Sequence, residues 1–321
     1  MSRSRFFSSV LIALAALSLP ACGGGGGGGG DGGGGVPGPL LALAITGDPA
    51  PGGLNEVYNG PVTGGSNLPV MDVAPNGFAA FEMRVMPANP LRTAGVVENR
   101  AIFAAEPDGT VTRVFTTGEA APDRPNSEEI AQFNRVWVCD DGTVIAHVTT
   151  EDGGSKDALI AATISGGVRT DTTGILYEGA SPLGVSGPIK GIESDARLGV
   201  GACRLFVILI DSNDDRVLYV IDADGSDGQA LLTEGGTGVG GASVESIDGF
   251  GISENGERGA VMVDTTADPG GQELWRWLGG ASGCRYAPWK PICSQTRRRG
   301  LPVSITSRSL QGLWTYETWW Q

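Results

Sequence analysis

Short runs that alternate between apolar and polar residues follow tight turn pairs at several places along the chain. Asn76-Gly77, Asp141-Gly142 and Asn255-Gly256 each introduce such a run, for example Thr143–Val148. Asn-Gly and Asp-Gly supply the positive φ angles that tight hairpins require, and alternation with period two is typical of half-buried β-strands. The pattern therefore predicts short antiparallel strands rather than helices.

The turn glycines recur at a spacing of about 57–60 residues, which indicates an internal repeat. They fall into three interleaved series, each with four members: Gly77, Gly142, Gly201 and Gly256; Gly109, Gly166, Gly225 and Gly279; and Gly47, Gly118, Gly179 and Gly235. A repeat of this length that cannot bury both faces alone must stack against its copies.

Three more predicted strands follow the turn-led strand in the repeat. The second covers 100–105, 158–162, 217–221 and 273–277; the third 111–115, 174–177 and 229–232; and the fourth 130–138, 189–192 and 244–252. Four short strands per period are typical of a propeller blade. We predict an all-β, β-propeller-like domain of about four four-stranded blades over residues 41–278. Four blades are the lower limit of a closed propeller, so blades can be missing.

A single helical turn is predicted at 127–133, with Ser127 as its cap.

Individual motifs resemble two known families. Residues 219–225 (Tyr-Val-Ile-Asp-Ala-Asp-Gly), followed by Ser253-Glu254-Asn255-Gly256, are similar to blades of TolB-type (WD40-like) propellers. Thr46–Gly52 is echoed at 117–122, and with Gly77, Ala80 and Phe81 it resembles bacterial surface proteins with tandem NxxGxxAF repeats; Ala74 stands where that motif has Asn. Both resemblances imply a repetitive β-domain, and neither supplies a catalytic set.

The start of the chain has the three-part form of an export signal. Arg3 and Arg5 precede the apolar run 6–19, which is shorter than the roughly 20 residues of a membrane span. Leu19-Pro20-Ala21-Cys22 resembles the lipobox of bacterial lipoproteins, which implies a signal peptide over 1–21 and acylation of Cys22. A plain secretory signal is the alternative. Residues 22–40 are predicted to be a disordered, Gly-rich tether.

Composition and charge agree with an exported protein. The 321 residues include 53 glycines and carry a net charge of −14, which opposes binding to nucleic acid. Residues 279–321 differ, because they hold six basic residues and one acid, Glu317. We interpret this atypical basic tail either as a frameshifted, truncated or disordered end or as a genuine closing segment. Gly23 after Cys22 favours the outer membrane of the bacterial envelope, by resemblance to lipoprotein sorting signals.

The sequence offers few residues for chemistry, and none is assigned as catalytic. Asp211, Asn213 and Asp215 alternate like the start of a calcium loop but lack its glycine and distal glutamate, so a solvated hairpin turn is the alternative to a Ca²⁺ site. Cys284 and Cys293 are spaced to close a small disulfide loop. Cys139 and Cys203 are predicted to be buried residues that form no bridge. His147, the only histidine, is predicted to pack on a strand.

These features favour a lipid-anchored, non-enzymatic module that binds a protein or polysaccharide at the cell envelope. Its expected partners are the membrane, through the anchor, and an envelope protein or polysaccharide. Two alternatives stay open. One is a propeller-type glycosidase or lyase that uses carboxylates from blade turns. The other is a truncated product without function.

Overall fold

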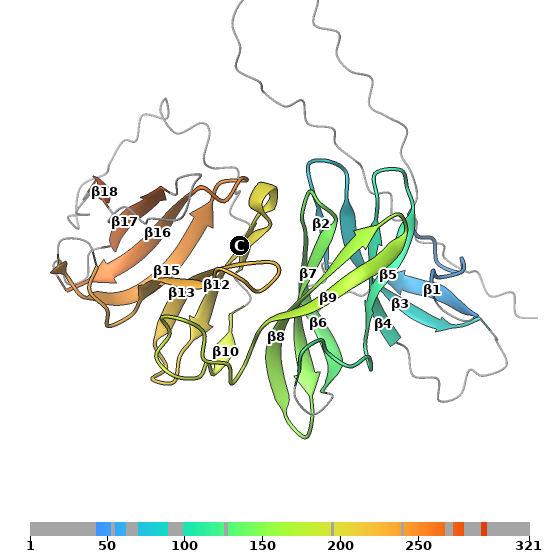
Figure 1. Ribbon diagram of the computed structural model, residues 1–321, viewed down its shortest axis with the longest axis horizontal. Helices are drawn as coiled ribbons and strands as arrows, with labels where there is room; N and C mark the ends of the chain where they lie inside the picture. The colour runs from blue at the N-terminus through green and yellow to red at the C-terminus, as the bar shows by residue number, and fades with distance from the viewer. Residues whose placement is uncertain are drawn as a thin grey trace, which may run out of the picture.

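The protein is built from antiparallel β-sheets. The computed structural model describes residues 43–52, 55–61, 70–88, 99–124, 128–193, 196–238, 241–266, 272–278 and 290–293. Within these ranges the strands form four sheets, and the only helical element is the 3₁₀ turn η3 (Val200–Ala202) (Figure 1). The predicted all-β class and the four-stranded repeat are thereby confirmed.

Each sheet consists of consecutive strands of the chain. The first contains β1 (Glu56–Pro61), β2 (Met71–Val73), β3 (Ala79–Pro87), β4 (Asn99–Ala105) and β5 (Val111–Thr116); the second β6 (Glu129–Val138), β7 (Thr143–Glu151), β8 (Ser155–Ser165) and β9 (Val168–Tyr177). The third contains β10 (Gly191–Ile192), β11 (Arg197–Gly199), β12 (Arg204–Ile210), β13 (Arg216–Asp222) and β14 (Gln229–Thr233); the fourth β15 (Val244–Ile252), β16 (Arg258–Thr265), β17 (Gln272–Leu278) and β18 (Lys290–Cys293). In the first and third sheets two short strands share the place of one, since β1 and β2 both pair with β3, and β10 and β11 both pair with β12.

The structure fixes which strands make up a blade. The strand that the sequence places fourth in each repeat pairs with the turn-led strand of the next repeat, as β6 does with β7 through the turn at Gly142. Each sheet therefore begins one strand before its landmark turn. Strand β18 lies within the region that the sequence sets apart as a tail, and it pairs with β17 to complete the fourth sheet.

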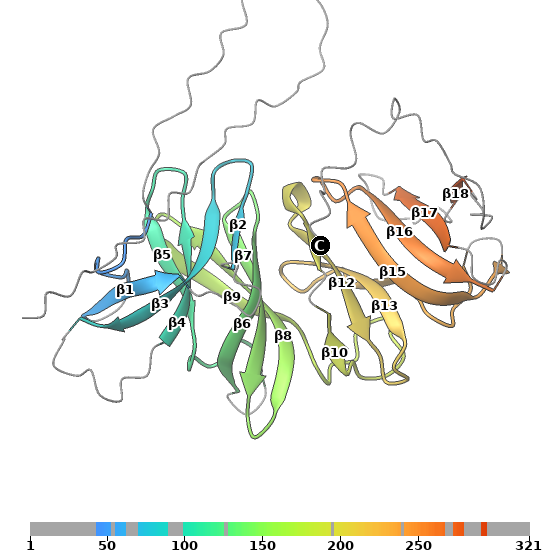
Figure 2. The ribbon, with the colours of Figure 1, turned by 180° about the vertical axis from the view of Figure 1, so that it is seen from behind.

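The four sheets stack face to face in chain order, like successive blades (Figures 1 and 2). Apolar side chains fill each interface: Ile102, Phe115 and Ile160 between the first and second sheets, Ile145, Leu205 and Tyr219 between the second and third, and Ile208, Leu218 and Trp275 between the third and fourth. The first and fourth sheets lie at opposite ends of the molecule in both views. The described blades therefore form an open arc and no closed ring.

The two ends of the arc differ. The outer face of the first sheet carries an aromatic cluster, in which the rings of Tyr58 and Phe103 have centroids 5.0 Å apart, and Leu43 and Ala44 pack against it. On the last sheet, Met262 and Leu274 pair across β16 and β17 and are 39% and 42% exposed. The first blade is thus capped by its own N-terminal segment, whereas part of the outer face of the fourth meets solvent.

The predicted helical turn at 127–133 is wrong. Glu129–Val138 is a strand that pairs with β7 along its length, and Ile130 and Phe133 are buried in the interface between the first two sheets. Tertiary pairing overrides the local cap signal here, as it commonly does for short segments. Ser127 itself lies outside the described residues, as do residues 1–42 with Cys22 and the predicted tether.

Candidate functional site

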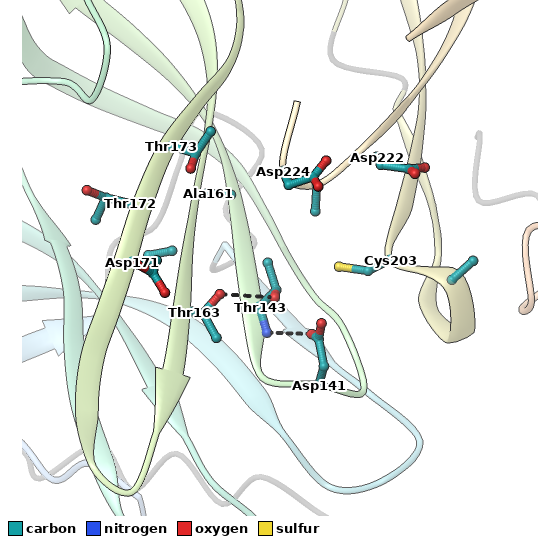
Figure 3. Close-up of a pocket in the computed structure, with 13 residues that line it drawn as sticks. Asp141, Thr143, Ala161, Thr163, Asp171, Thr172, Thr173, Cys203, Asp222 and Asp224 are labelled. Atoms are coloured by element: carbon teal, nitrogen blue, oxygen red, sulfur yellow. Dashed lines mark hydrogen bonds between the residues drawn. The ribbon is translucent and has the colours of Figure 1, made fainter. Parts of the chain in front are cut away.

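A polar groove of about 530 Å³ lies between the second and third sheets. Its second-sheet wall comes from β7, β8, β9 and the turn before β7, and its third-sheet wall from the segments around η3 and the end of β13 (Figure 3). The lining is rich in carboxylates and hydroxyls: Asp141, Asp171, Asp222, Asp224, Thr143, Thr163, Thr172 and Thr173. Its apolar members are alanines and Cys203, so the groove offers hydrogen-bond acceptors rather than a stacking platform.

Two of the acids lie in Asp-Gly turns at different places in consecutive blades, Asp141 just before β7 and Asp224 just before β14. The carboxylate of Asp141 accepts a hydrogen bond from the backbone N–H of Thr143 at 2.9 Å, and that of Asp224 accepts one from Ser226 at 2.8 Å. Both are Asp-Gly turns in which the glycine has positive φ, which explains why the repeat landmarks bring acids to the groove. Hydrogen bonds from the side chain and backbone of Ser226 lower the pKa of Asp224, so this group stays ionised near neutral pH.

The other lining groups are held by cross-strand neighbours. Asp222 pairs with Arg204 on the adjacent strand, with Nε–Oδ1 at 2.5 Å and Nη2–Oδ2 at 3.2 Å. The hydroxyls of Thr143 and Thr163 lie 3.4 Å apart. Asp171 lies on β9, where residues 168–172 are all exposed. The groove therefore presents acidic groups from both walls to solvent.

A disulfide joins Cys139 and Cys203, which corrects the prediction that these residues form no bridge. Their Cα atoms are 5.4 Å apart although 64 residues separate them in the chain. Cys139 precedes the landmark turn of the second blade by three residues, whereas Cys203 follows that of the third by two. Because the two cysteines lie at different distances from their landmark glycines, the sequence repeat did not predict that these segments of neighbouring blades meet beside the groove. Cys139 is completely buried, as predicted, whereas Cys203 is only partly buried, because it lines the open groove.

The candidate calcium residues lie together in the turn between β12 and β13, away from the groove. Oδ1 of the fully buried Asp211 accepts hydrogen bonds from the backbone N–H groups of Asn213 at 2.7 Å and Asp215 at 3.0 Å. These hydrogen bonds engage the Asp211 carboxylate with the backbone, as is typical of a hairpin turn. They therefore favour the solvated hairpin turn over a Ca²⁺ site. The Ca²⁺ site remains a prediction.

The histidine is packed as predicted. His147 is 3% exposed on β7, and its Nε2 lies 3.4 Å from Oδ1 of Asp157 on β8. Of the other predicted residues, Cys22 and Cys284 lie outside the described part of the chain. For Cys293 the structure describes only its place at the end of β18. The acylation and the Cys284–Cys293 disulfide therefore stay predictions.

Sequence reasoning missed a buried carboxyl group in the first blade. Glu82 is 2% exposed on β3, where burial raises its pKa to about 7 although Arg100 and Arg84 act in the opposite direction. Its Oε1 lies 3.8 Å from Nη1 of Arg100, and within the described structure it has no hydrogen-bond partner. The signal was available, because alternation along 79–85 places Glu82 on the inward face with Ala80. The same face holds Asp72, whose pKa is also raised by burial.

The structure places the protein in the class of propeller-like arrays of four-stranded blades. Comparisons with known proteins assign it to no particular family within that class. No protein-family model matches the chain, and no curated protein is significantly similar to it. The resemblances to TolB-type and NxxGxxAF repeats therefore remain at the level of short motifs. No helix in the described residues is long and apolar enough to cross a membrane.

Solved structures with similar folds are propeller-type proteins of low sequence identity. An α-L-arabinanase from Penicillium chrysogenum, complexed with arabinobiose, is 12% identical with a TM-score of 0.35 over 74% of this chain and 71% of its own. A proposed hydrolase from Bacteroides ovatus is 8% identical (TM-score 0.30; 74% and 70%), and a proposed 6-phosphogluconolactonase from Bacteroides fragilis is 11% identical (0.26; 70% and 84%). Similarities this low carry no argument about activity.

Proposed function

We propose that this protein is a lipid-anchored binding module of the bacterial cell envelope, and that the groove between its second and third blades binds a polysaccharide. The observation that carries the proposal is the groove itself, which is lined by carboxylates from two blades and by hydroxyls from the second (Figure 3). Sugar hydroxyl and amino groups are hydrogen-bond donors, and charged acceptors form the stronger hydrogen bonds.

The state of two groove acids, Asp224 and Asp222, favours binding over hydrolysis. A glycosidase needs one carboxylic acid with a raised pKa to protonate the leaving group. In the groove, the pKa of Asp224 is lowered, and Asp222 is paired with Arg204. The two acids whose pKa is raised by burial, Glu82 and Asp72, are packed in the first blade and do not line the groove.

Export and anchoring are supported by two features that are independent of the groove. The lipobox-like sequence ends at Cys22, and the apolar run before it is typical of a signal peptide. The Cys139–Cys203 disulfide is the kind of bond that persists outside the cytoplasm. A lipid on Cys22 followed by a Gly-rich tether would hold the blades near an envelope surface.

The test is calorimetric titration of the protein with soluble chitosan oligomers, which are rich in amino groups, and with dextran, which offers hydroxyls alone. Binding to either, weakened at least tenfold in a Asp141→Asn, Asp224→Asn double variant, would support the groove. Asp152→Asn, in the exposed turn after β7, is the control that should leave affinity unchanged. Equal affinity in all three proteins, or binding only to a basic peptide, would refute the polysaccharide proposal. Product formation from either glycan would instead favour the glycosidase or lyase alternative.

A further inference from the structure

One group of potential metal ligands stands out among the described residues. The Sγ atoms of Cys139 and Cys203 and a carboxylate oxygen of Asp141 all lie within 4.8 Å of one another. Asp141 and Cys203 line the groove, whereas Cys139 is buried behind it. The group thus joins two blades and has one side open to solvent.

Backbone hydrogen bonds hold the second-blade ligands in place. The N–H of Cys139 donates to the carbonyl of Thr143 at 2.9 Å, and the N–H of Gly142 donates to the carbonyl of Cys139 at 3.2 Å. The N–H of Thr143 in turn orients the carboxylate of Asp141. This tight turn therefore presents Cys139 and Asp141 to the same point, and contacts of this kind orient metal ligands.

Cys203 is fixed from the third blade with an unusual backbone conformation. It ends η3 with φ of 48° and donates its N–H to the carbonyl of Val200 at 3.2 Å. Its carbonyl accepts a hydrogen bond from Ala223 at 3.0 Å. A left-handed conformation is uncommon for a residue with a side chain, and such strain concentrates at functional positions. Here it directs the sulfur of Cys203 across the interface toward Cys139.

We propose that Cys139, Cys203 and Asp141 bind Zn²⁺ when the disulfide is reduced. A dithiol reductant would give two electrons and two protons to the disulfide, yielding two thiols and its own disulfide. Zinc would then displace the two thiol protons, forming bonds of about 2.3 Å to sulfur and about 2.0–2.2 Å to oxygen. Tetrahedral coordination would separate the sulfurs by roughly 3.8 Å, which suits cysteines whose Cα atoms are 5.4 Å apart. Two thiolates select zinc over calcium or magnesium.

The open side of the site leaves room for a fourth zinc ligand. Three protein ligands leave one tetrahedral position, which a water molecule can occupy from the groove. The inference is independent of the proposed polysaccharide, because it rests on the two cysteines and the turn at Asp141. It gives the blade interface two states, one joined by a disulfide and one joined by a metal ion.

The experiment uses the full chain with Cys22, Cys284 and Cys293 replaced by serine, so that Cys139 and Cys203 are its only cysteines. The protein is prepared oxidised or reduced under anaerobic conditions and titrated with Zn²⁺ against a chromophoric chelator. Co²⁺ titration adds a thiolate charge-transfer absorption that surface carboxylates cannot produce. We expect one Zn²⁺ per reduced chain and no comparable binding to the oxidised chain.

Variants identify the ligands. Cys139→Ser or Cys203→Ser should each lower affinity at least 100-fold and weaken the Co²⁺ absorption, whereas Asp141→Asn should lower affinity by about 10-fold or more. Asp140→Asn, in the same turn, is the matched control and should retain full affinity. The proposal is overturned if the reduced chain binds no more tightly than a variant lacking both cysteines, or if oxidised and reduced chains bind alike. It is equally overturned if Asp140→Asn and Asp141→Asn have the same effect, or if the reduced chain unfolds and zinc does not restore its circular dichroism.

Discussion

The carboxylate of Asp72 in the first blade accepts a hydrogen bond from the backbone N–H of Val138 in the second blade, at 3.0 Å. Asp72 lies on β2 and Val138 ends β6, and these strands pack against each other. Burial raises the pKa of Asp72, although this hydrogen bond acts to lower it. The contact therefore joins two blades through an acid and a main-chain donor.

The same type of contact recurs along the array. Glu106 in the first blade accepts hydrogen bonds from the backbone N–H groups of Gly166 and Gly167 in the second, at 3.0 and 2.5 Å. Glu234, after the last strand of the third blade, accepts one from Ile247 in the fourth at 2.8 Å. Part of the strong negative charge of this protein thus satisfies backbone donors between blades. The contacts to Val138, Gly167 and Ile247 are partly buried, where an unpaired donor would be costly.

Replacing Glu82 by Gln should stabilise the protein in alkaline solution. The folded-state pKa is about 7, above the ordinary value of 4.5, so this group stabilises the fold fully below pH 4.5 and loses that contribution as pH rises through 7. The wild-type free energy of unfolding should fall by up to about 3 kcal/mol between pH 5 and pH 9 through this group alone. In Glu82→Gln that component of the decrease should be absent.

Urea unfolding at pH 5, 7 and 9 measures this effect. Glu245→Gln, an exposed position on β15, is the control and should follow the wild-type pH dependence. If Glu82→Gln showed the same decrease as the wild type, the buried carboxyl group would not be the cause.

Glu128 should have the opposite pH dependence. Burial opposes its ionisation, but hydrogen bonds from Lys156, Thr150 and Arg124 outweigh burial and hold its pKa at about 2. Its contribution to stability is therefore present above pH 4.5 and lost as pH falls toward 2. Glu128→Gln should lower the free energy of unfolding at pH 7 by about 3–5 kcal/mol, because it leaves the guanidinium of Arg124 buried without its anion.

The matched control for this variant is Glu129→Gln, which changes the exposed neighbouring side chain. Guanidinium unfolding at pH 7 and at pH 3 should show a large deficit for Glu128→Gln at neutral pH and a smaller one in acid. Similar stability of the two variants at pH 7 would contradict the importance of the buried ion pair.

Local sequence patterns predicted the strands correctly. The same patterns did not predict contacts between segments that are distant in the sequence. The Asp-Gly turn at Asp141 and the alternation around His147 are short-range features, so both were correctly interpreted. The Cys139–Cys203 bridge depends on which turns of successive blades are neighbours, and one irregular 3₁₀ turn before Cys203 shifts the offset that sequence comparison relies on.

The groove was also missed, because it too depends on which segments of successive blades are neighbours. Asp141 and Asp224 each look like ordinary solvated turn acids in the sequence. Only stacking of the second and third blades places them on opposite walls of one groove. The predicted helix at 127–133 failed for a different reason: residues 129–133 pair as part of strand β6, and Glu128 forms a buried ion pair with Arg124 and Lys156.

Cys22→Ser should release the protein from membranes. If acyl chains on Cys22 provide the anchor, the wild type should partition into the detergent phase of a Triton X-114 extract and the variant into the aqueous phase. Metabolic labelling with a fatty-acid analogue should mark the wild type and leave Cys22→Ser unmarked. Cys284→Ser is a control that should behave as wild type. Equal partitioning of Cys22→Ser and wild type would argue against the lipid anchor.

The inter-blade disulfide should contribute strongly to stability in oxidising solution. Closing a loop of 64 residues is expected to stabilise the folded state by about 4 kcal/mol. The Cys139→Ser, Cys203→Ser double variant should therefore unfold at lower urea concentration than the oxidised wild type and match the reduced wild type in metal-free buffer. Peptide mapping without reduction should recover the Cys139–Cys203 pair, and the same map tests the predicted Cys284–Cys293 bridge. Recovery of Cys139 or Cys203 as a free thiol in the oxidised protein would contradict the pairing.

Backbone contact between the third and fourth blades should make Gly199→Ala destabilising and Gly201→Ala nearly neutral. A Cβ atom on Gly199 would lie 2.6 Å from the Cα of Gly256 in the fourth blade, whereas one on Gly201 would be no closer than 3.7 Å to its neighbours. Because backbone atoms cannot rotate away, Gly199→Ala should separate the two turns and lower the free energy of unfolding by about 1–3 kcal/mol. Gly201→Ala should stay within about 0.5 kcal/mol of wild type. Urea unfolding of both variants decides the matter: equal stabilities would show that the two blades can move apart at this contact without loss.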